Sequence, residues 1–370
     1  MLAAAGLALV AAELAVRAVS PQAVGRAPAM YAADSVLIHR LQPMFQGPLR
    51  SGEYATSVTI NDRGFRGGPW RLDMSRRVLV LGDSFTFGYG VEESEAYPAV
   101  LERLSAHEGC PTAVYNAGVP GYGTLQERGI APGLLAMVRP QIVVLGFTVG
   151  SDLSDNLEQG VRPEAGYEVR DGFLVQKGTP GGTSLPLKAW MQERSHLYVL
   201  LQRARIRLAM RGARGVRSTR PCEHFLAVAP CGDMAVAWDL TATALRDIGD
   251  LCHDSGAQLI VLLIPHPVQV DSALWRSELA AFEDPQALGR FVVQERIMAL
   301  CDELGVSCMD PLPAFRGRAS TLFFRLDRHL TADGHAVLAN TFFPSILTLL
   351  RASPHESVDT AGLSDANCMQ

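Results

Sequence analysis

The chain has 370 residues, of which 48% are hydrophobic and 19% are charged, so it can bury a sizeable core and is not a disordered segment. Its net charge of −5 leaves no overall excess of Lys and Arg, which argues against a nucleic-acid partner. Length alone suggests roughly two or three domains.

The N-terminus is the segment that bears on location. It opens with the apolar run MLAAAGLALVAAELAV, which Glu13 and then Arg17 interrupt. The run is shorter than the roughly 20 apolar residues that span a bilayer, and no basic region precedes it. We interpret residues 1–20 as the remnant of an export signal or signal anchor, against the alternative of an Ala/Leu-rich surface helix. This interpretation predicts a protein of the cell envelope.

The cysteines agree weakly with export. Cys222 and Cys231 flank the segment EHFLAVAP, and this spacing is compatible with a short disulfide loop, although it does not settle whether the two are bridged. The other five show no CxxC or Cys/His ligand spacing, so we expect no metal site; they are Cys110, Cys252, Cys301, Cys308 and Cys368.

The central part of the chain alternates between short apolar runs and amphipathic stretches. After a linker and an entry strand in residues 21–75, the apolar runs are VLVLG from Val78, TAVYNAG from Thr112, QIVVLGF from Gln141, QLIVLLIP from Gln258 and VSCMDPL from Val306. Continuous apolarity is typical of strands covered on both faces. We therefore expect residues 76–351 to form a three-layer α/β/α sandwich around a five-stranded parallel sheet.

The alternation breaks between about residues 152 and 233, which we interpret as a cap-like insertion over one edge of the sheet. The segment YEVRDGFLVQKG predicts a hairpin that turns at Asp171-Gly172, and residues 185–211 predict a long helix. The basic stretch Arg203 to Arg220 suits anionic lipid headgroups, an acidic substrate or simply a solvated loop. The polar tail, residues 352–370, has no periodicity and is expected to be loose.

Ligands of parallel sheets bind outside the carboxyl ends of the strands. Three of the apolar runs end there in polar residues, namely Gly82-Asp83-Ser84, Asn116-Ala117-Gly118 and Gly150-Ser151-Asp152. We therefore expect a functional site at these three strand ends.

A second candidate motif, RLDRHLTADGH, lies near the C-terminus and places Asp327 and His329 just before Thr331, a candidate N-cap of the last helix. A serine nucleophile needs a base to take its proton and an acid to orient that base. Ser84, His329 and Asp327 supply the three roles. The G-x-S-x-G nucleophile elbow does not fit, because Thr86 stands where that motif has its second glycine.

Four blocks in order carry a resemblance to a known family. The segments VLGDSFTFGYGVEE, YNAGVPGYGTLQE, VVLGFTVGSDLSDN and DRHLTADGH resemble those of SGNH/GDSL-family esterases and lipases, over most of Thr59 to Leu350 except the insertion. The segment INDRGFRG and the apolar N-terminus look like the exported or membrane-anchored bacterial branch, on the periplasmic side. The resemblance implies a flavodoxin-like sandwich, no cofactor, and attack by the Ser84 hydroxyl on an ester carbonyl.

The resemblance also implies an oxyanion hole, and here the chain departs from the family. The expected donors are the backbone N–H groups of Ser84 and Gly118 and a third group, usually an asparagine side chain, at the position of Ser151. Losing one such donor typically lowers turnover roughly a hundred- to a thousandfold. Either Ser151 donates directly or through water, or Asn156 or Asn116 substitutes, or catalysis is weakened.

Three functions therefore stay open. The first is a serine esterase that cleaves an acyl ester of a glycan or lipid through an acyl-enzyme, and the second is an O-acyltransferase with the same triad and a sugar or lipid acceptor. The third is a carbohydrate- or lipid-binding protein with weakened catalysis. Of the other histidines, His335 is expected to be structural, and His266 either lines the pocket or fills a loop.

Overall fold

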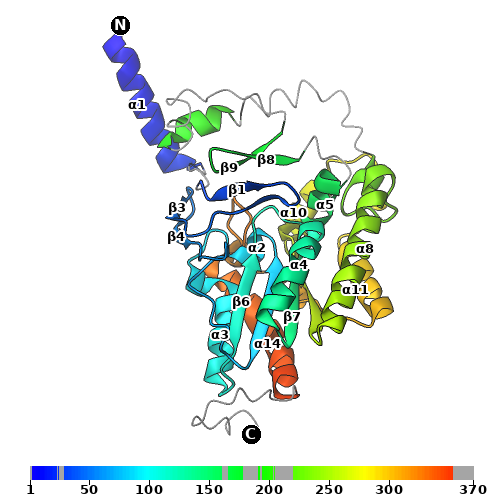
Figure 1. Ribbon diagram of the computed structural model, residues 1–370. Coiled ribbons are helices and arrows are strands. Elements are labelled where there is room, and N and C mark those ends of the chain that lie inside the picture. Colours follow the sequence, from blue (N-terminus) through cyan, green and yellow to red (C-terminus); the bar gives the residue numbers. More distant parts are fainter. Residues whose placement is uncertain are drawn as a thin grey trace.

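The computed structural model describes residues 2–22, 24, 29–160, 166–177, 191, 194–202, 204 and 220–352. Its centre is a parallel sheet (Figure 1). The five strands of this sheet lie in the order β11-β10-β7-β5-β6. The strands are β5 (Arg77–Gly82), β6 (Ala113–Gly118), β7 (Ile142–Thr148), β10 (Gln258–Ile264) and β11 (Ser307–Met309). All five coincide with the apolar runs of the sequence, so the predicted sheet is confirmed.

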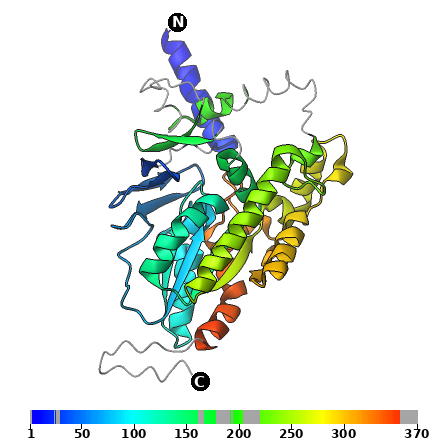
Figure 2. The same ribbon diagram turned by 45° about the vertical axis from the view of Figure 1, so that its right-hand side comes forward.

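Helices cover both faces of this sheet (Figure 2). On one face, α3 (Tyr97–His107) and α14 (Ala332–Ala352) pack against a strand face that includes Val78 and Val80. On the other face, α4 (Thr124–Val138), α8 (Gly232–Asp254) and α11 (Val292–Leu304) pack against a face that includes Leu79 and Leu81. Successive strand residues thus enter opposite cores, which explains the continuous apolarity and confirms the three layers.

Shorter helices connect these elements. They are α2 (Ser84–Phe87), α5 (Asp152–Gly160), α9 (Pro267–Val270), α10 (Ser272–Leu279), α12 (Leu312–Phe315) and α13 (Ala319–Leu322), with 3-10 turns at η1 (Glu93–Glu95), η2 (Pro221–Glu223) and η3 (Pro285–Ala287). The helix α2 begins at the candidate nucleophile, directly after β5.

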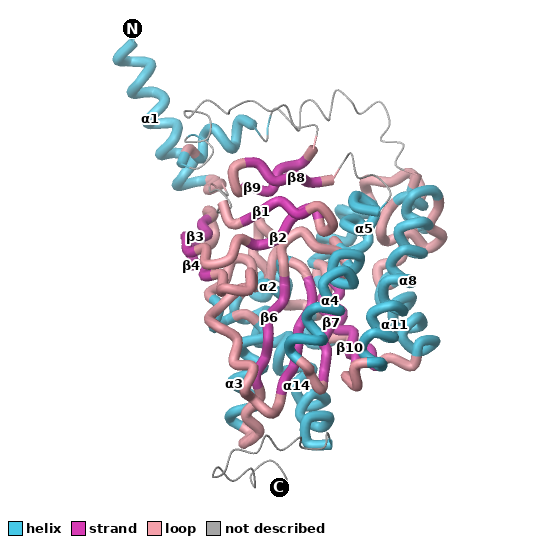
Figure 3. The backbone as a smooth tube through the Cα atoms, in the orientation of Figure 1, coloured by secondary structure: helices cyan, strands magenta, loops and turns pink. Residues whose placement is uncertain are grey.

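The segment before the sheet is more structured than the predicted linker with one strand. It forms two antiparallel hairpins, β1 (Tyr31–Asp34) with β2 (Ile38–Leu41) and β3 (Gln46–Arg50) with β4 (Ala55–Thr59), as Figure 3 shows. Their apolar residues join a small core with Phe87 and Tyr122, which follow β5 and β6. Local preference does not predict a strand such as β3, which contains Gly and Pro, because its pairing depends on this tertiary packing.

The hairpin inside the insertion is confirmed. Strands β8 (Tyr167–Arg170) and β9 (Phe173–Gln176) pair antiparallel across a turn with φ of 50° at Asp171 and 79° at Gly172. The hairpin lies against the first one, where the N–H of Tyr31 donates to the Gly172 carbonyl at 3.0 Å (Figure 1). The predicted long helix, residues 185–211, is described at 191, 194–202 and 204, and it is helical there except at Ser195; residues 185–190, 192, 193, 203 and 205–219 and the tail 353–370 lie outside the described residues.

The N-terminal helix α1 (Leu2–Val19) projects from the body of the molecule (Figure 1). Glu13 binds the insertion, because its carboxylate accepts hydrogen bonds from the Ser195 hydroxyl and from the N–H groups of His196 and Leu197. Within the described residues, no helix has the length and apolarity that crossing a membrane requires. The envelope location therefore stays a prediction.

The structure joins Cys222 and Cys231 by a disulfide whose Cα atoms are 5.2 Å apart. The bridge ties η2 to the start of α8, and the N–H of Cys231 also donates to the Cys222 carbonyl at 2.9 Å. The pairing that the sequence left open is thus formed.

Candidate active site

The structure brings together the three residues predicted to form a triad. Ser84 and His329 lie 245 positions apart in the chain, yet Nε2 of His329 is 2.8 Å from the Ser84 hydroxyl oxygen. The other ring nitrogen, Nδ1, is hydrogen-bonded to Oδ1 of Asp327. A serine, an imidazole and a carboxylate in this order are the arrangement that moves a proton from the serine to the base.

The position of Ser84 follows from the end of β5. The side chain of Asp83 caps α2 by accepting a hydrogen bond from the Phe85 N–H at 2.8 Å, which stops the strand and starts the helix at Ser84. Gly82 is required because a Cβ there would lie 2.0 Å from the Thr86 hydroxyl oxygen. The sharp change from strand to helix therefore places the Ser84 hydroxyl at the carboxyl edge of the sheet.

The acid and base lie on a short loop before α14. Within the loop, Arg328 takes a left-handed φ of 77°, and the Phe324 N–H donates to the His329 carbonyl at 2.9 Å. Thr331 then caps the helix, because its hydroxyl accepts from the Gly334 N–H at 3.2 Å, as predicted. Hydrogen bonds hold the loop at both ends, so Asp327 and His329 lie side by side next to Ser84.

The surroundings favour an ionised acid next to an imidazole. Burial raises the pKa of Asp327, but the hydrogen bond and charge of His329 and the Tyr54 hydroxyl outweigh it and leave the pKa below its usual value. The rings of Phe85 and Tyr89 lie 4.8 and 4.9 Å from the His329 ring. These contacts restrict the imidazole to the plane in which it meets Ser84.

The expected oxyanion donors are not equally available. The N–H of Ser84 donates to no residue in the described part of the chain, whereas the N–H of Gly118 donates to Oδ1 of Asn116 at 2.9 Å. The Ser151 hydroxyl lies nearby but donates to Oδ2 of Asp83 at 3.0 Å. The roles expected of Gly118 and Ser151 therefore require existing bonds to open.

The two asparagines considered as substitute oxyanion donors each have other hydrogen-bond partners in the structure. The amide of Asn116 donates to the Thr86 carbonyl at 3.0 Å while its oxygen holds Gly118. Asn156 is fully buried, and it donates to the Thr241 hydroxyl at 2.8 Å and accepts from the Leu125 N–H at 3.0 Å. Both side chains hold the backbone around the site, and the hydrogen bonds that their amide groups donate go to Thr86 and Thr241 and not to a group at Ser84.

Two histidines outside the candidate triad, His335 and His266, have different surroundings. His335 is buried in the core under α3, where its Nδ1 accepts from the Tyr97 N–H at 3.3 Å, in agreement with a structural role. Burial lowers the pKa of His335 to about 3 and that of His266 to about 4. His266 packs against Gly150, next to Ser151, where a Cβ would be 2.3 Å from its ring. It therefore lines the edge of the site.

The sequence did not reveal three residues that hold the site together. Tyr54 and Glu53, in the turn of the hairpin β3–β4, bond the acid–base loop. Arg66, within INDRGFRG, is buried, and its guanidinium donates to the carbonyls of Phe87 and Val91 at 2.9 and 2.6 Å. The motif INDRGFRG by itself does not indicate which loop the arginine contacts.

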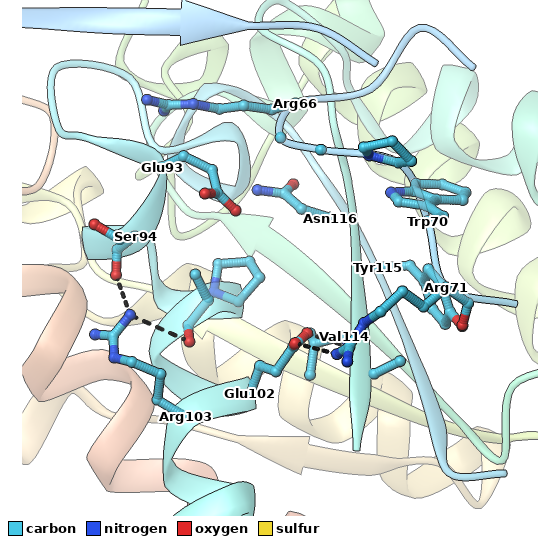
Figure 4. A pocket seen from close by; sticks show the side chains of 16 residues that line it. Arg66, Trp70, Arg71, Glu93, Ser94, Glu102, Arg103, Val114, Tyr115 and Asn116 are labelled. Carbon is cyan, nitrogen blue, oxygen red and sulfur yellow. Dashed lines mark hydrogen bonds and ion pairs between the residues drawn. The ribbon is translucent and has the colours of Figure 1, made fainter. Parts of the chain in front are cut away.

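Arg66 also lines the wall of a cavity of about 280 Å³ beside the edge strand β6 (Figure 4). The cavity lies between α3 and residues 66–71, which include Trp70, and its lining also includes Glu93 and Asn116. None of the triad residues lines it. The cavity and the candidate active site are therefore separate. Arg66 connects them, because it lines the cavity and binds the carbonyls of Phe87 and Val91 in the segment that follows Ser84.

Comparison with known proteins gives a partial likeness. No family model matches the chain. Esterase TesA of Pseudomonas aeruginosa is 32% identical over 71 residues, which are 19% of this chain and 35% of that protein. The match thus spans about a third of the relative's length, and the activity of that whole protein does not transfer by it.

Solved structures with similar chains are more distant. They include TesA (16% identity, TM-score 0.39, 74% of this chain and 99% of that chain), the esterase EstA from Pseudoalteromonas (13%, 0.40, 74% and 98%) and the lipase/acylhydrolase from Enterococcus faecalis (14%, 0.39, 73% and 95%). TM-scores this low carry no argument, so the comparison rests on the chain's own residues. By its four sequence blocks and its local match to TesA, the chain is similar to the SGNH/GDSL esterases.

Proposed function

We propose that the protein is a serine esterase of the SGNH/GDSL type, which cleaves an ester-linked acyl group through an acyl-enzyme. The observation that carries the proposal is the line of contacts from the Ser84 hydroxyl through His329 to Asp327. The sequence blocks and the local match to an esterase support it. An acyl ester of a glycan or a lipid is the substrate class that this chemistry suits.

In the proposed mechanism, His329 takes the hydroxyl proton as the Ser84 oxygen forms a bond to the ester carbonyl carbon. Collapse of the tetrahedral intermediate breaks the bond to the alcohol oxygen, and His329 gives its proton to that oxygen. Water then attacks the acyl-serine with His329 again as base, which releases the acid and restores Ser84. Asp327 holds the imidazole in the tautomer with its proton on Nδ1 throughout.

The oxyanion needs donors, and the N–H of Ser84 is the first that we assign. The N–H of Gly121 is the second, since Gly118 is bonded to Asn116 while Gly121, in the same turn, donates to no described residue. Gly121 has a φ of 85°, which suits a residue without a side chain. With two oxyanion donors, turnover is expected to be lower than it would be with three.

The test is labelling with a fluorophosphonate probe, which reacts only with an activated serine. Wild-type protein is expected to be labelled at Ser84, and Ser84→Ala is expected to lose the label. Ser255→Ala is the matched control, because that hydroxyl caps the far end of α8 by donating to the Cys252 carbonyl. Absence of labelling in folded wild-type protein contradicts the proposal.

A panel of acyl esters of varied chain length, with and without an excess of alcohol acceptors, then separates the remaining functions. Release of free acid regardless of acceptor supports an esterase. Diversion of the acyl group to a sugar or lipid hydroxyl favours the O-acyltransferase instead, and labelling without turnover of any ester favours the binding protein.

A further inference from the structure

The hairpin β3–β4 reaches the carboxylate of the candidate triad. Tyr54 lies in the turn just before β4, 273 positions from Asp327, and its hydroxyl donates to Oδ2 of Asp327 at 2.8 Å. The other carboxylate oxygen, Oδ1, holds His329. Each oxygen of the acid thus has its own donor, one on the base and one on the hairpin.

The residue before it holds the backbone of the same loop. The carboxylate of Glu53 accepts hydrogen bonds from the N–H groups of Leu326 and Asp327, at 2.9 and 2.8 Å. Hydrogen bonds to an ionised acceptor are stronger than neutral ones. Two adjacent residues of one turn therefore fix both the main chain and the side chain of the acid.

Aromatic packing fixes the ring that carries this hydroxyl. The Tyr54 ring lies 4.9 Å from Phe324, in the acid–base loop, and 6.3 Å edge-on from Tyr89. A Cβ at Gly90 would lie 2.8 Å from the Phe324 ring and 3.1 Å from the Tyr54 ring, so this approach needs a glycine. Because Tyr89 also packs on His329, the ring of Tyr54 belongs to the aromatic wall of the site.

We propose that Tyr54 is a positioning residue of the triad, which keeps Oδ1 of Asp327 facing the imidazole, and that Glu53 holds the loop for it. A carboxylate bound through one oxygen alone can turn about its Cβ–Cγ bond and weaken its contact with the base. A donor on the second oxygen prevents that rotation and satisfies a group that is largely buried. The inference rests on the proposed function and adds a fourth side chain to it.

The test is a double-mutant cycle read as the rate of Ser84 labelling and of ester hydrolysis. Tyr54→Phe is expected to lower kcat roughly tenfold with KM unchanged, as for loss of a hydrogen bond to a charged group. In an Asp327→Asn background the same change is expected to have no further effect, because Tyr54 acts through that carboxylate. The acidic limb of the pH–rate profile is expected to move to higher pH, since the carboxylate facing His329 loses a partner for its charge.

Tyr115→Phe is the matched control, because its hydroxyl donates to the Arg71 carbonyl at 2.6 Å, away from the triad. Equal rates for wild type, Tyr54→Phe and Tyr115→Phe overturn the inference. So does an equal loss from Tyr54→Phe with and without Asp327→Asn, since that marks a general structural effect. If Tyr54→Phe does not fold, Glu53→Gln takes its place, with the same acid-limb measurement. Unlabelled wild-type protein would instead contradict the proposed function itself.

Discussion

Ser151 and Asp83 form a hydrogen bond at the edge of the site, and this bond occupies the one hydrogen that the Ser151 hydroxyl could donate to an oxyanion. The hydroxyl donates to Oδ2 of Asp83, whose other oxygen caps α2. Asp83 is buried, and this burial raises its pKa. While Asp83 is ionised, the hydroxyl hydrogen of Ser151 points to it and not to a substrate.

This contact predicts different effects for two substitutions of Ser151. Ser151→Asn brings an amide donor to the same place, so we expect roughly a tenfold rise in kcat, a part of what one oxyanion donor contributes. Ser151→Ala is expected to change kcat little and to lower stability by roughly 1–3 kcal/mol, because a buried carboxylate oxygen loses its partner. Ester hydrolysis and urea denaturation measure the two.

Ser151→Thr keeps the hydroxyl and serves as control. A loss of a hundredfold or more in Ser151→Ala, with no gain in Ser151→Asn, shows that the natural hydroxyl is itself the third donor. Activity found only in Ser151→Asn supports the third function considered from the sequence, a binding protein with weakened catalysis.

At the scale of elements, three contacts help to attach the described part of the insertion. The Cys222–Cys231 bridge ties η2 to α8, the hairpin β8–β9 bonds to β1 at Tyr31, and the helical residues 196–202 begin at the carboxylate of Glu13. Burial raises the pKa of Glu13, but hydrogen bonds from Arg17, from Ser195 and from the backbone N–H groups of Leu197 and His196 together outweigh it and lower the pKa to about 2. Glu13 and Arg17, which interrupt the apolar run of α1, thus serve to bind the insertion.

The disulfide gives a prediction at this scale. Replacing both cysteines by serine, Cys222→Ser with Cys231→Ser, is expected to lower the free energy of unfolding by roughly 2–3 kcal/mol, because the unfolded chain gains the entropy of an open loop. The rate of Ser84 labelling is expected to stay unchanged, since neither sulfur touches the triad. Denaturation with and without reductant measures the effect.

The comparison carries its own control. Because Cys110 is also disulfide-bonded, reductant is expected to act on both proteins and to destabilise wild-type protein more than the double variant. Equal stability of oxidised wild type and double variant contradicts the prediction and indicates that hydrogen bonds such as that from Cys231 to Cys222 hold η2 in place without the bridge.

For the whole molecule, buried titratable groups govern the dependence of stability on pH. Burial lowers the pKa of His335 to about 3 and those of His39 and His266 to about 4, from an ordinary 6.5. Unfolding lets each histidine take up a proton between its folded value and 6.5. Their contribution to stability is therefore complete above about pH 6.5 and is lost as pH falls toward 3. Burial raises the pKa of Glu127 and Asp152. The contribution of these two carboxyl groups to stability therefore grows as pH falls, opposite to that of the histidines.

His335→Gln isolates one of these groups. The glutamine oxygen can still accept from the Tyr97 N–H, but it does not titrate, so the slope of unfolding free energy against pH near pH 5 is expected to fall by about 1.4 kcal/mol per pH unit. Urea denaturation over a series of pH values measures it. His107→Gln is the control, because that side chain is 86% exposed and its replacement is expected to leave the slope unchanged. An unchanged slope in both variants contradicts a neutral, buried His335.

The sequence by itself determined the features that depend on local pattern. The five strands, the three layers, the turn at Asp171-Gly172 and the cap at Thr331 all follow from periodicity, turn residues and capping residues close together in the chain. The candidate triad could also be proposed from the sequence, because Asp327 and His329 share one motif and Ser84 follows a strand whose edge is predictable.

Only the tertiary structure decided which partner each polar group has. Whether Ser151 faces Asp83, whether the Asn116 amide reaches the Thr86 carbonyl and whether Tyr54 reaches Asp327 depends on packing between segments tens to hundreds of residues apart. No periodicity encodes such pairs, since a donor chooses its acceptor by where the folded chain brings both. The hairpins before the sheet escaped prediction for the same reason, because their strands form against a core that other segments supply.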